Sequence, residues 1–533
     1  MSLVDGIEIR TSKIPGAGNG LFAKRTFESG DVVLELQRPL VAELYDQYRE
    51  HSCAWCFLRA PASEMERKRA TSFGSRTANI TVTACTGCKT TRYCSKVCQR
   101  KAWRSEHKYE CKVLCQEQLN QPTRIVLKLL GRLRAGEESM KTIMDYHSKQ
   151  NDVKMEDPDY HDKLSKAVAT AWQHCERTED LSGGLAMAMT LGFNVMLNSL
   201  NLSNTATPSD QVGRGFDPVL CAANHSCDPN SFFVFETPRA VLRAARKIKE
   251  GEEVFISYKS DTKPFKYRQA ELKEFYFFDC RCPKCEKGTA PDKFNMPSTE
   301  LSPVWCQRAE ELLHIQKRDG VDLSRYWVGA TDADIRMTAL QAEAFEKHEH
   351  GQEIGDIEDS KTALRICLES KMWPLTREPV PSILRDLQTA YMSKGRIYSA
   401  FRIALKLHFV IYTSRGASLP GNLYLLSSFN VMQLAFGVVE SSDGARRIRD
   451  MEEKFQFRLL PMGLLMQMSE QVPLTVGWNS EMGHRVQHAW RTLLEPLGGV
   501  PPEPMKRQIA DTWPKMQAYA ESIDLLAIVN NTE

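Results

Sequence analysis

The residues best suited to chemistry lie in one short stretch near the middle of the chain, Asn224-His225-Ser226-Cys227-Asp228-Pro229-Asn230. It combines amide side chains, an imidazole, a thiol and a proline, and is too polar for a core strand. Two distant segments carry further candidates: a glycine-rich run at residues 16–20, and residues 251–258, which end in Tyr258. A function shared by these segments requires a fold that brings them together.

Cysteine and histidine residues at metal-ligand spacing form the strongest chemical signal. The pattern runs Cys53-x2-Cys56, Cys85-x2-Cys88, Cys94-x3-Cys98 and His107-x3-Cys111. Its eight ligands are enough for two closed tetrahedral zinc sites, and ligands four residues apart share one helix face. Because ten of the sixteen cysteines fall in these pairs or in the run Cys280-x-Cys282-x2-Cys285, the chain predicts zinc in a reducing compartment rather than disulfides. Closed sites hold a fold and perform no chemistry.

Taken in order, these segments resemble the SET domain of protein lysine methyltransferases, and the ligand pattern with Tyr93 before Cys94 resembles a MYND zinc finger. The resemblance to the SET and MYND domain-containing protein lysine methyltransferase family rests on specific motifs from residue 1 to about 290. It implies an enzyme that transfers methyl groups from S-adenosylmethionine to lysines of histone or non-histone proteins. It also implies an α+β fold: a SET β-fold with a pseudoknot, an inserted MYND finger, a helical insertion, a post-SET zinc knuckle and a tetratricopeptide-like helical C-terminal domain.

The resemblance further implies three structural zinc ions with defined ligands. In the MYND finger the ligand sets interleave, with Cys53, Cys56, Cys94 and Cys98 in one and Cys85, Cys88, His107 and Cys111 in the other. In the post-SET knuckle, Cys280, Cys282 and Cys285 leave a tetrahedral site one ligand short, and Cys227 is the expected fourth.

The resemblance also assigns roles around the cofactor and the substrate. Tyr258 is implied as the catalytic residue, and Tyr276 lines the substrate channel with it. The residues implied in cofactor binding are Gly18, Asn19, Asn198, Asn224, His225, Tyr258 and Phe278. Two alternatives stay open, since Asn198 is equally well explained as a capped or water-bound asparagine, and Phe277 as a core aromatic residue.

The chain departs from the family's pattern at two points. Ala17 stands where members often carry a basic residue, which removes one polar contact to the cofactor. Small residues precede the central motif in place of bulky apolar ones, so the local packing must differ; they are Cys221, Ala222 and Ala223.

The elements that must position these residues follow from hydrophobic periodicity. Residues 7–45 alternate as a small antiparallel sheet does. Residues 120–205 keep a helical period, with a buried helix expected over 185–202. Two strands joined by a turn are expected over 241–256, and in the family the segment ending at Tyr258 threads beneath the central motif.

Residues 300–525 are helical in pattern, with a tetratricopeptide-like helix pair around Gly395. The resulting boundaries are 1–50 and 211–260 for the two parts of the SET domain, 51–115 for the MYND finger, 116–210 for the insertion, 261–290 for the knuckle and 300–530 for the helical domain.

Two charged segments allow more than one interpretation. The spacer at residues 57–84 is longer than usual and rich in charged and hydroxyl side chains, which predicts a mobile surface loop. The finger itself is rich in basic side chains, and the simpler explanation for them is a helix face exposed to solvent. The alternative is contact with the phosphates of a nucleic acid. MYND fingers generally act as protein-interaction modules, so protein partners of the finger are a further expectation.

Composition narrows the class of protein. The net charge of +3 does not by itself favour nucleic acid. No apolar run approaches the length of a bilayer and the first residues lack a signal peptide's apolar core, so we expect a soluble, intracellular protein without membrane contact. We further expect a monomer that is located in the nucleus and cytoplasm. Its expected partner is a protein substrate that presents a lysine. The alternative function is a non-catalytic MYND-type adapter or transcriptional regulator that uses the SET fold as a scaffold.

Overall fold

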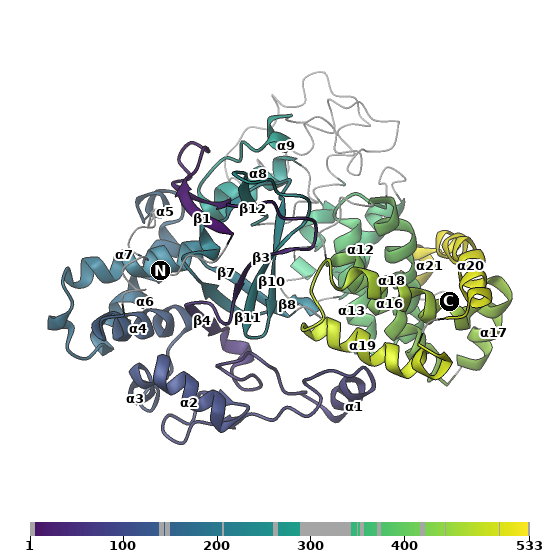
Figure 1. Ribbon diagram of the computed structural model, residues 1–533, viewed down its shortest axis with the longest axis horizontal. Coiled ribbons are helices and arrows are strands. Elements are labelled where there is room, and N and C mark those ends of the chain that lie inside the picture. Colours follow the sequence, from purple (N-terminus) through teal and green to yellow (C-terminus); the bar gives the residue numbers. More distant parts are fainter. Residues whose placement is uncertain are drawn as a thin grey trace. The chain divides into compact units, whose positions relative to one another are not determined.

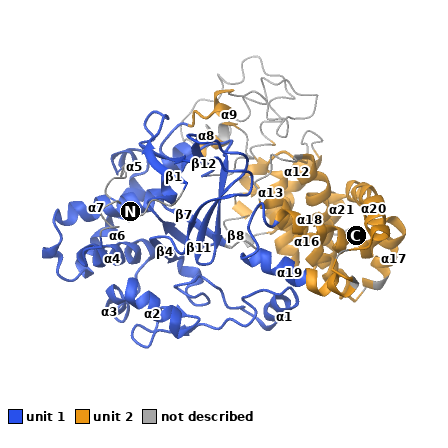
Figure 2. Ribbon diagram, in the orientation of Figure 1, with its two compact units in different colours: residues 1–258, 272–279, 472–489 blue, residues 259–271, 280–471, 490–533 orange. Residues whose placement is uncertain are grey.

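The computed structural model, shown in Figure 1, describes residues 6–137, 143, 150–204, 207–258, 265–287, 340, 343–348, 350–351, 357–369, 375–415, 422–442, 444–499 and 501–530. The chain divides into two compact units, coloured in Figure 2: residues 1–258, 272–279 and 472–489 form the first, and residues 259–271, 280–471 and 490–533 the second. The first unit contains the sheets, and the described part of the second is helical. The predicted α+β class is confirmed.

A four-stranded sheet in the first unit has the order β1-β2-β12-β9. Its strands are β1 (Ile7–Thr11), β2 (Asn19–Ala23), β12 (Glu253–Ile256) and β9 (Asn224–His225). The turn between β1 and β2 contains Gly16 and Gly18 at φ +79° and +71°, a left-handed conformation that glycine adopts without steric cost. Leu21, Val254 and Ile256 are buried and anchor this sheet in the core.

A six-stranded sheet follows the order β3-β11-β10-β7-β8-β4. Its strands are β3 (Val32–Leu36), β11 (Arg239–Ala244), β10 (Ser231–Glu236), β7 (Leu200–Asn204), β8 (Thr207–Phe216) and β4 (Val41–Leu44). The strands expected over 241–256 exist, but β11 and β12 belong to different sheets. The chain passes from one sheet to the other through a turn in which Glu252 N–H donates to Lys249 O at 3.0 Å.

The expected zinc finger is built from short elements. A two-stranded sheet of β5 (Thr83–Ala84) and β6 (Arg92–Tyr93) precedes helix α2 (Lys96–Ser105), a 3-10 turn at His107–Tyr109 and α3 (Cys111–Leu114). Ser95 begins α2, because its hydroxyl accepts a hydrogen bond from Cys98 N–H at 3.2 Å. Such small elements have little core of their own, which agrees with the expectation of metal ions that hold them together.

The spacer at residues 57–84 does not follow the expectation of a mobile loop. It contains helix α1 (Glu64–Ser72), and the residues after this helix contact a distant segment of the same unit. Ser75 is buried, and its hydroxyl donates to Glu481 Oε1 at 2.5 Å. Arg485 Nε donates to the same carboxylate oxygen at 3.0 Å. The composition of the spacer cannot reveal a contact across 406 residues of chain.

Helices of the insertion are α4 (Gln121–Arg134), α5 (Gln150–Glu156), α6 (Pro158–His174) and α7 (Gly184–Asn198). The helix expected over 185–202 is too long by four residues, since α7 ends at Asn198 and Ser199 is extended at φ −76° and ψ 145°. From Leu200 the chain belongs to β7. An apolar run does not by itself separate a buried helix from a buried strand.

In the described part of the chain the further α-helices are α8 (Phe265–Tyr276), α9 (Pro283–Glu286), α12 (Ile357–Glu369), α13 (Val380–Ser393), α14 (Ile397–Leu405), α15 (Thr413–Arg415), α16 (Leu423–Val439), α17 (Gly444–Phe455), α18 (Leu460–Gln471), α19 (Glu481–Leu493), α20 (Glu503–Ser522) and α21 (Leu525–Val529). The expected pair around Gly395 consists of α13 and α14, and α14 continues as a π-helix at Lys406–Tyr412.

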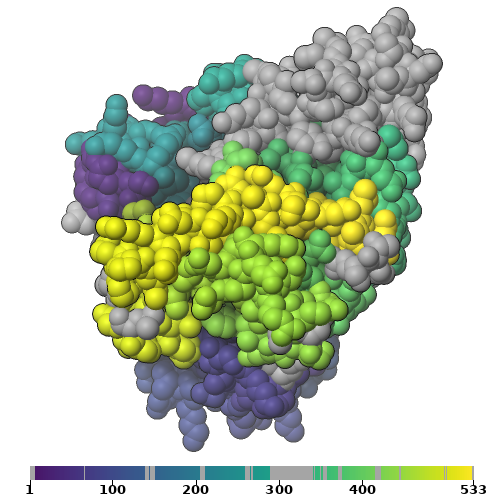
Figure 3. Space-filling model, turned by 90° about the vertical axis from the view of Figure 1, so that its right-hand side faces the viewer, coloured from purple at the N-terminus to yellow at the C-terminus, as the bar shows by residue number. Residues whose placement is uncertain are grey.

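Helix α20 is amphipathic. Its buried side chains recur every three or four residues, at Ile509, Thr512, Met516 and Ala520. Residues of the C-terminal end of the chain, in yellow, form part of the face drawn in Figure 3. Among the described residues, we find no helix with both the length and the apolar character needed to cross a membrane.

Candidate functional site

The central motif lies beside the strand that precedes Tyr258. Strand β9 pairs with β12 in parallel, with Asn224 opposite Phe255 and His225 opposite Ile256. Ser226 N–H continues the pairing by donating to Ile256 O at 3.0 Å. Because β12 also pairs with β2, it lies between the first strands of the chain and the central motif. The three segments singled out by sequence therefore meet in one four-stranded sheet.

Asn230, the last residue of the motif, holds this arrangement together. Its side chain is fully buried, its Nδ2 donates to Glu253 O at 2.8 Å, and its Oδ1 accepts from Phe255 N–H at 2.8 Å. One amide thus satisfies two buried backbone groups of β12, which would otherwise be costly to bury. The sequence motif contains Asn230, but its spacing alone gives no indication of this role.

Glu253 links the glycine-rich loop to the central motif. Asn224 Nδ2 donates to Glu253 Oε1 at 2.8 Å and to Asn19 O at 3.0 Å. Ser12 Oγ donates to the same carboxylate, at 2.9 and 3.0 Å from its two oxygens. A Cβ on Gly20 would lie 2.3 Å from Glu253 Oε1, so the close approach requires glycine. The sequence offered one signal for this residue, a glutamate at the start of an otherwise apolar strand, and sequence reasoning did not use it.

His225 and Tyr258 are joined by a backbone hydrogen bond. Tyr258 N–H donates to His225 Nδ1 at 3.0 Å, and the two rings lie 5.3 Å apart. The phenol donates to Ala223 O at 3.0 Å. Burial raises the pKa of the Tyr258 phenol above its usual value, with Cys221 and Tyr276 adding to the shift, so the phenol stays protonated near neutral pH.

Two aromatic residues complete the surroundings of Tyr258. The Tyr276 ring lies 4.9 Å from it, and the Tyr276 hydroxyl donates to Tyr258 O at 3.3 Å. The Phe278 ring lies 6.0 Å from His225 and 6.5 Å from Tyr258. Phe277, between them in sequence, has a left-handed φ of +61° and packs against the hydrophobic core. This agrees with the alternative in which Phe277 is a core aromatic residue.

The other expected cofactor residues differ in how closely they are tied to this arrangement. Gly18 O accepts from Ser12 N–H at 2.8 Å, which closes the loop, and the exposed Asn19 follows it at the start of β2. Asn198 lies at the end of α7, where its amide donates to Asn194 O at 2.8 Å within the same helix. That bond fits the structural alternative for Asn198, and its role toward a cofactor stays a prediction.

Three groups of cysteine and histidine side chains have the composition of metal centres. They are Cys53, Cys56, Cys94 and Cys98; Cys85, Cys88, His107 and Cys111; and Cys227, Cys280, Cys282 and Cys285. In each group the ligand atoms all lie within 4.8 Å of one another. These groups contain the same residues as the ligand sets expected from sequence.

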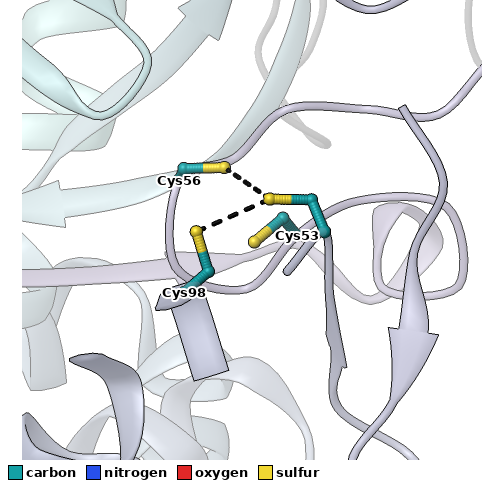
Figure 4. A group of neighbouring side chains, drawn as sticks. Cys53, Cys56 and Cys98 are labelled. Carbon is teal, nitrogen blue, oxygen red and sulfur yellow. Dashed lines mark hydrogen bonds between the residues drawn. The ribbon is translucent and has the colours of Figure 1, made fainter. Parts of the chain in front are cut away.

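The spacing within the finger groups suits tetrahedral zinc. With Zn–S bonds of about 2.3 Å, the sulfur atoms of a tetrahedral site lie about 3.8 Å apart. The Sγ of Cys94 lies 3.6 Å from that of Cys56 and 3.5 Å from that of Cys98. In the second group, the Sγ atoms of Cys85 and Cys111 are 3.9 Å apart. Figure 4 shows Cys53, Cys56 and Cys98 pointing toward one another.

Comparison with known proteins places these features in a family context. Residues 18–259 match the SET domain family. The human protein named Histone-lysine N-methyltransferase SMYD3 is 34% identical over 254 residues, which cover 46% of this chain and 56% of that protein. A Schizosaccharomyces pombe protein named SET domain and MYND-type zinc finger protein 6 is 32% identical over 208 residues, or 38% of this chain and 40% of that protein.

A mouse protein named Histone-lysine N-methyltransferase Smyd1 is 27% identical over 317 residues, which cover 56% of this chain and 60% of that protein. The chain thus spans about half the length of the curated relatives it matches.

Proposed function

We propose that this chain, a SET domain protein related to the SMYD lysine methyltransferases, transfers methyl groups from S-adenosylmethionine to lysine side chains of a protein. The observation that carries the proposal is the position of Tyr258. Its backbone is bonded to His225, its ring lies beside Tyr276, and its phenol is fixed by Ala223 O. A neutral phenol held among aromatic rings suits the recognition of an amine that must lose its charge.

We assign cofactor binding to Gly18, Asn19, Asn198, Asn224, His225, Tyr258 and Phe278. The bond from the Asn224 amide to Asn19 O supports the assignment, because it fixes the glycine-rich loop against the central motif. When bound, S-adenosylmethionine supplies a methyl group on a positively charged sulfur. The exposed Asn19 and the aromatic Phe278 offer a polar and an apolar contact for such a ligand.

We assign the lysine channel to Tyr258 and Tyr276. A free lysine has a pKa of ~10.4 and is protonated at neutral pH. An aromatic, water-poor channel disfavours the ammonium form and lowers that pKa. Because the Tyr258 hydroxyl donates its hydrogen to Ala223 O, its oxygen lone pairs are left to accept an N–H from the neutral amine. Such a contact orients the amine. Holding the reacting atoms in line and about 3 to 3.5 Å apart supplies a large part of the rate enhancement.

Zinc is the metal that we propose for the three cysteine-containing groups. Sets of four cysteines, or of three with one histidine, are the ligands of structural zinc, and each set here is complete. The residues would hold the finger and the knuckle in shape and leave no coordination position for a substrate.

Calorimetric titration with S-adenosylmethionine tests the enzymatic proposal against the adapter alternative. We expect one binding site per chain in the wild type. Asn224→Ala removes the amide that fixes Asn19 and Glu253 and should raise the Kd by roughly 10- to 100-fold, as expected for loss of a bond to a charged group. Asn201→Ala, at an exposed asparagine of β7, is the control. A wild-type protein that binds no cofactor would favour the adapter.

We also infer that the finger binds a protein partner. Helix α2 exposes 52% of Val97 and 48% of Trp103, and exposed apolar side chains of this size mark interaction sites. Titration of a proline-rich peptide should quench the fluorescence of Trp103. Trp103→Ala should not bind the peptide, whereas Val439→Ala, at an exposed position of α16, should bind it normally. Steeply salt-dependent binding of DNA in place of the peptide would point to the nucleic-acid alternative.

A further inference from the structure

The zinc ligand His107 carries a buried hydrogen bond on the side away from its metal group. His107 Nδ1 lies 2.8 Å from Glu110 Oε1, and the two side chains are only 1% and 2% exposed. The other ring nitrogen, Nε2, lies 3.7 Å from Cys88 Sγ and faces the cysteines. With Nε2 directed at the metal, Nδ1 carries the hydrogen and donates it to the carboxylate. This is the usual arrangement by which a carboxylate orients a histidine ligand.

Glu110 is in turn held by a lysine from outside the finger. Lys128, in helix α4 of the insertion, is 6% exposed, and its Nζ lies 3.4 Å from Glu110 Oε1. The same ammonium lies 2.5 Å from Glu43 Oε2 in β4 and 3.8 Å from Glu106. An ammonium this buried requires paired carboxylates, because an isolated charge there would be very costly.

The network extends to the first metal group and to the six-stranded sheet. Arg38, between β3 and β4, donates to Glu106 Oε1 at 2.7 Å and stacks on the ring of Trp55 at 4.4 Å. Trp55 lies between two zinc ligands in sequence. Arg124 of α4 donates to Glu43 Oε1 at 3.0 Å. Three buried carboxylates are thereby matched by three cations: Glu43, Glu106 and Glu110 by Arg38, Arg124 and Lys128.

The charges of the network are firmly set. Burial alone would raise the pKa of Glu43, but Lys128 and Arg124 outweigh burial and hold it at about 2. For Lys128, burial opposes the charge, and Glu110, Glu43 and Glu106 together raise its pKa above the usual value. The ion pairs of Glu43 with Lys128 and Arg124 therefore persist across the physiological pH range and act as fixed connections.

We propose that Glu110 is a positioning residue for the second zinc group, and that Lys128 connects it to β4, so that metal binding by the finger and docking of helix α4 are coupled. The coupling should affect one of the two finger groups more than the other. His107 belongs to the group of Cys85, Cys88 and Cys111, so loss of Glu110 or Lys128 should weaken that group first. A buried ion network that served only general stability would show no preference between the two finger groups.

The test uses the full chain loaded with zinc. Glu110→Gln and Lys128→Met are compared with Lys112→Met, which removes an exposed lysine paired with the exposed Glu176. Timed alkylation followed by peptide mass spectrometry reports the protection of each cysteine. We expect Cys85, Cys88 and Cys111 to react roughly 10- to 100-fold faster in the two buried variants, as for loss of an outer-shell partner. Cys53 and Cys56 should react at the wild-type rate, and Lys112→Met should match the wild type throughout.

Coupling between two sites acts in both directions, so a second measurement can use the wild type alone and does not depend on the folding of a variant. If the sites are coupled, removing zinc from the wild type with a chelator must loosen α4 by the same coupling free energy. Amide hydrogen exchange should then quicken in residues 121–134 and stay unchanged in α20. The proposal is overturned if α4 keeps its protection without zinc, or if Glu110→Gln exposes both finger groups equally or neither.

Discussion

The backbone N–H of Tyr258 donates a hydrogen bond to Nδ1 of His225 at 3.0 Å, across 33 residues of chain. With Nδ1 occupied as an acceptor, the neutral ring carries its hydrogen on Nε2, which lies 3.2 Å from Cys227 Sγ. One imidazole thus connects the tyrosine that we propose as catalytic with a cysteine of the third metal group. The catalytic proposal and the metal proposal depend on the same short stretch of backbone.

Asn230→Ala should destabilise the first unit. The substitution leaves Glu253 O and Phe255 N–H buried without their side-chain partner. At about 1 to 3 kcal/mol for each of the two unsatisfied groups, we expect a loss of about 2 to 6 kcal/mol in free energy of unfolding. Urea unfolding followed by fluorescence measures it. Asn201→Ala, whose partner bond is exposed, should cost less than about 0.5 kcal/mol. Equal losses in both variants would contradict the role given to Asn230.

Gly20→Ala should impair cofactor binding without unfolding the chain. The added Cβ would come within 2.3 Å of Glu253 Oε1 and push the carboxylate away from Asn224. We expect a rise in Kd for S-adenosylmethionine of roughly tenfold, equivalent to about 1.4 kcal/mol. Ser12→Ala removes only one donor to the same carboxylate and should have a smaller effect. A Gly20→Ala protein with wild-type affinity would show that Glu253 does not position Asn224.

Cys227→Ser should remove one zinc ion of three. The thiolate is the expected fourth ligand beside Cys280, Cys282 and Cys285. Removal of one ligand from a closed site lowers zinc affinity sharply. Native mass spectrometry should count two zinc ions in the variant and three in the wild type. A variant that retains three zinc ions would place Cys227 outside the metal site.

Acid should weaken the helical unit through His408. This residue is fully buried in the π-helix that follows α14, and within the described residues neither ring nitrogen has a hydrogen-bond partner. Burial lowers the pKa of His408 to about 3. Its unfolded value is about 6.5, so the unfolded chain binds the proton first. The contribution of neutral His408 to the free energy of unfolding is complete above pH 6.5. It falls by up to about 1.4 kcal/mol per pH unit below about pH 6.

His408→Phe, which keeps an aromatic ring between Phe409 and Tyr424, should flatten that dependence. Thermal unfolding between pH 4 and pH 7 measures it, with His51→Gln, at an exposed histidine, as the control. An unchanged pH dependence in His408→Phe would assign the acid sensitivity to other groups.

Local patterns predicted the metal groups, and long-range contacts account for what they missed. The spacing from Cys53 to Cys111 indicated two metal sites, because ligand pairs lie close in sequence and two tetrahedral metals need eight ligands, whereas the division of those ligands into two groups came from the family resemblance. The helical pair at α13 and α14 was also visible, since helical periodicity is local. The contact of Ser75 with Glu481 joins segments whose neighbours in sequence give no hint of it. For the same reason the network around Lys128 is invisible in the charge pattern of the finger.

The candidate site divides in the same way. The resemblance selected Asn224, His225 and Tyr258 as motif residues, and the structure brings these three together through β9 and β12. Glu253 and Asn230 act through bonds to backbone and side chains that only the folded chain defines. Strand β7 was assigned to a helix because Leu200 and Leu202 continue an apolar run, and the sheet, rather than local preference, determines their conformation.

The measurement that tests the central claim most directly is transfer of a radiolabelled methyl group from S-adenosylmethionine to the proteins of a cell extract, with Tyr258→Phe beside the wild type. We expect labelled lysine with the wild type, and roughly ten- to a thousand-fold less with Tyr258→Phe, a few kcal/mol in the barrier. Tyr519→Phe, in α20, should label like the wild type. Equal labelling by the wild type and Tyr258→Phe, or a wild type that labels no lysine, would contradict the account.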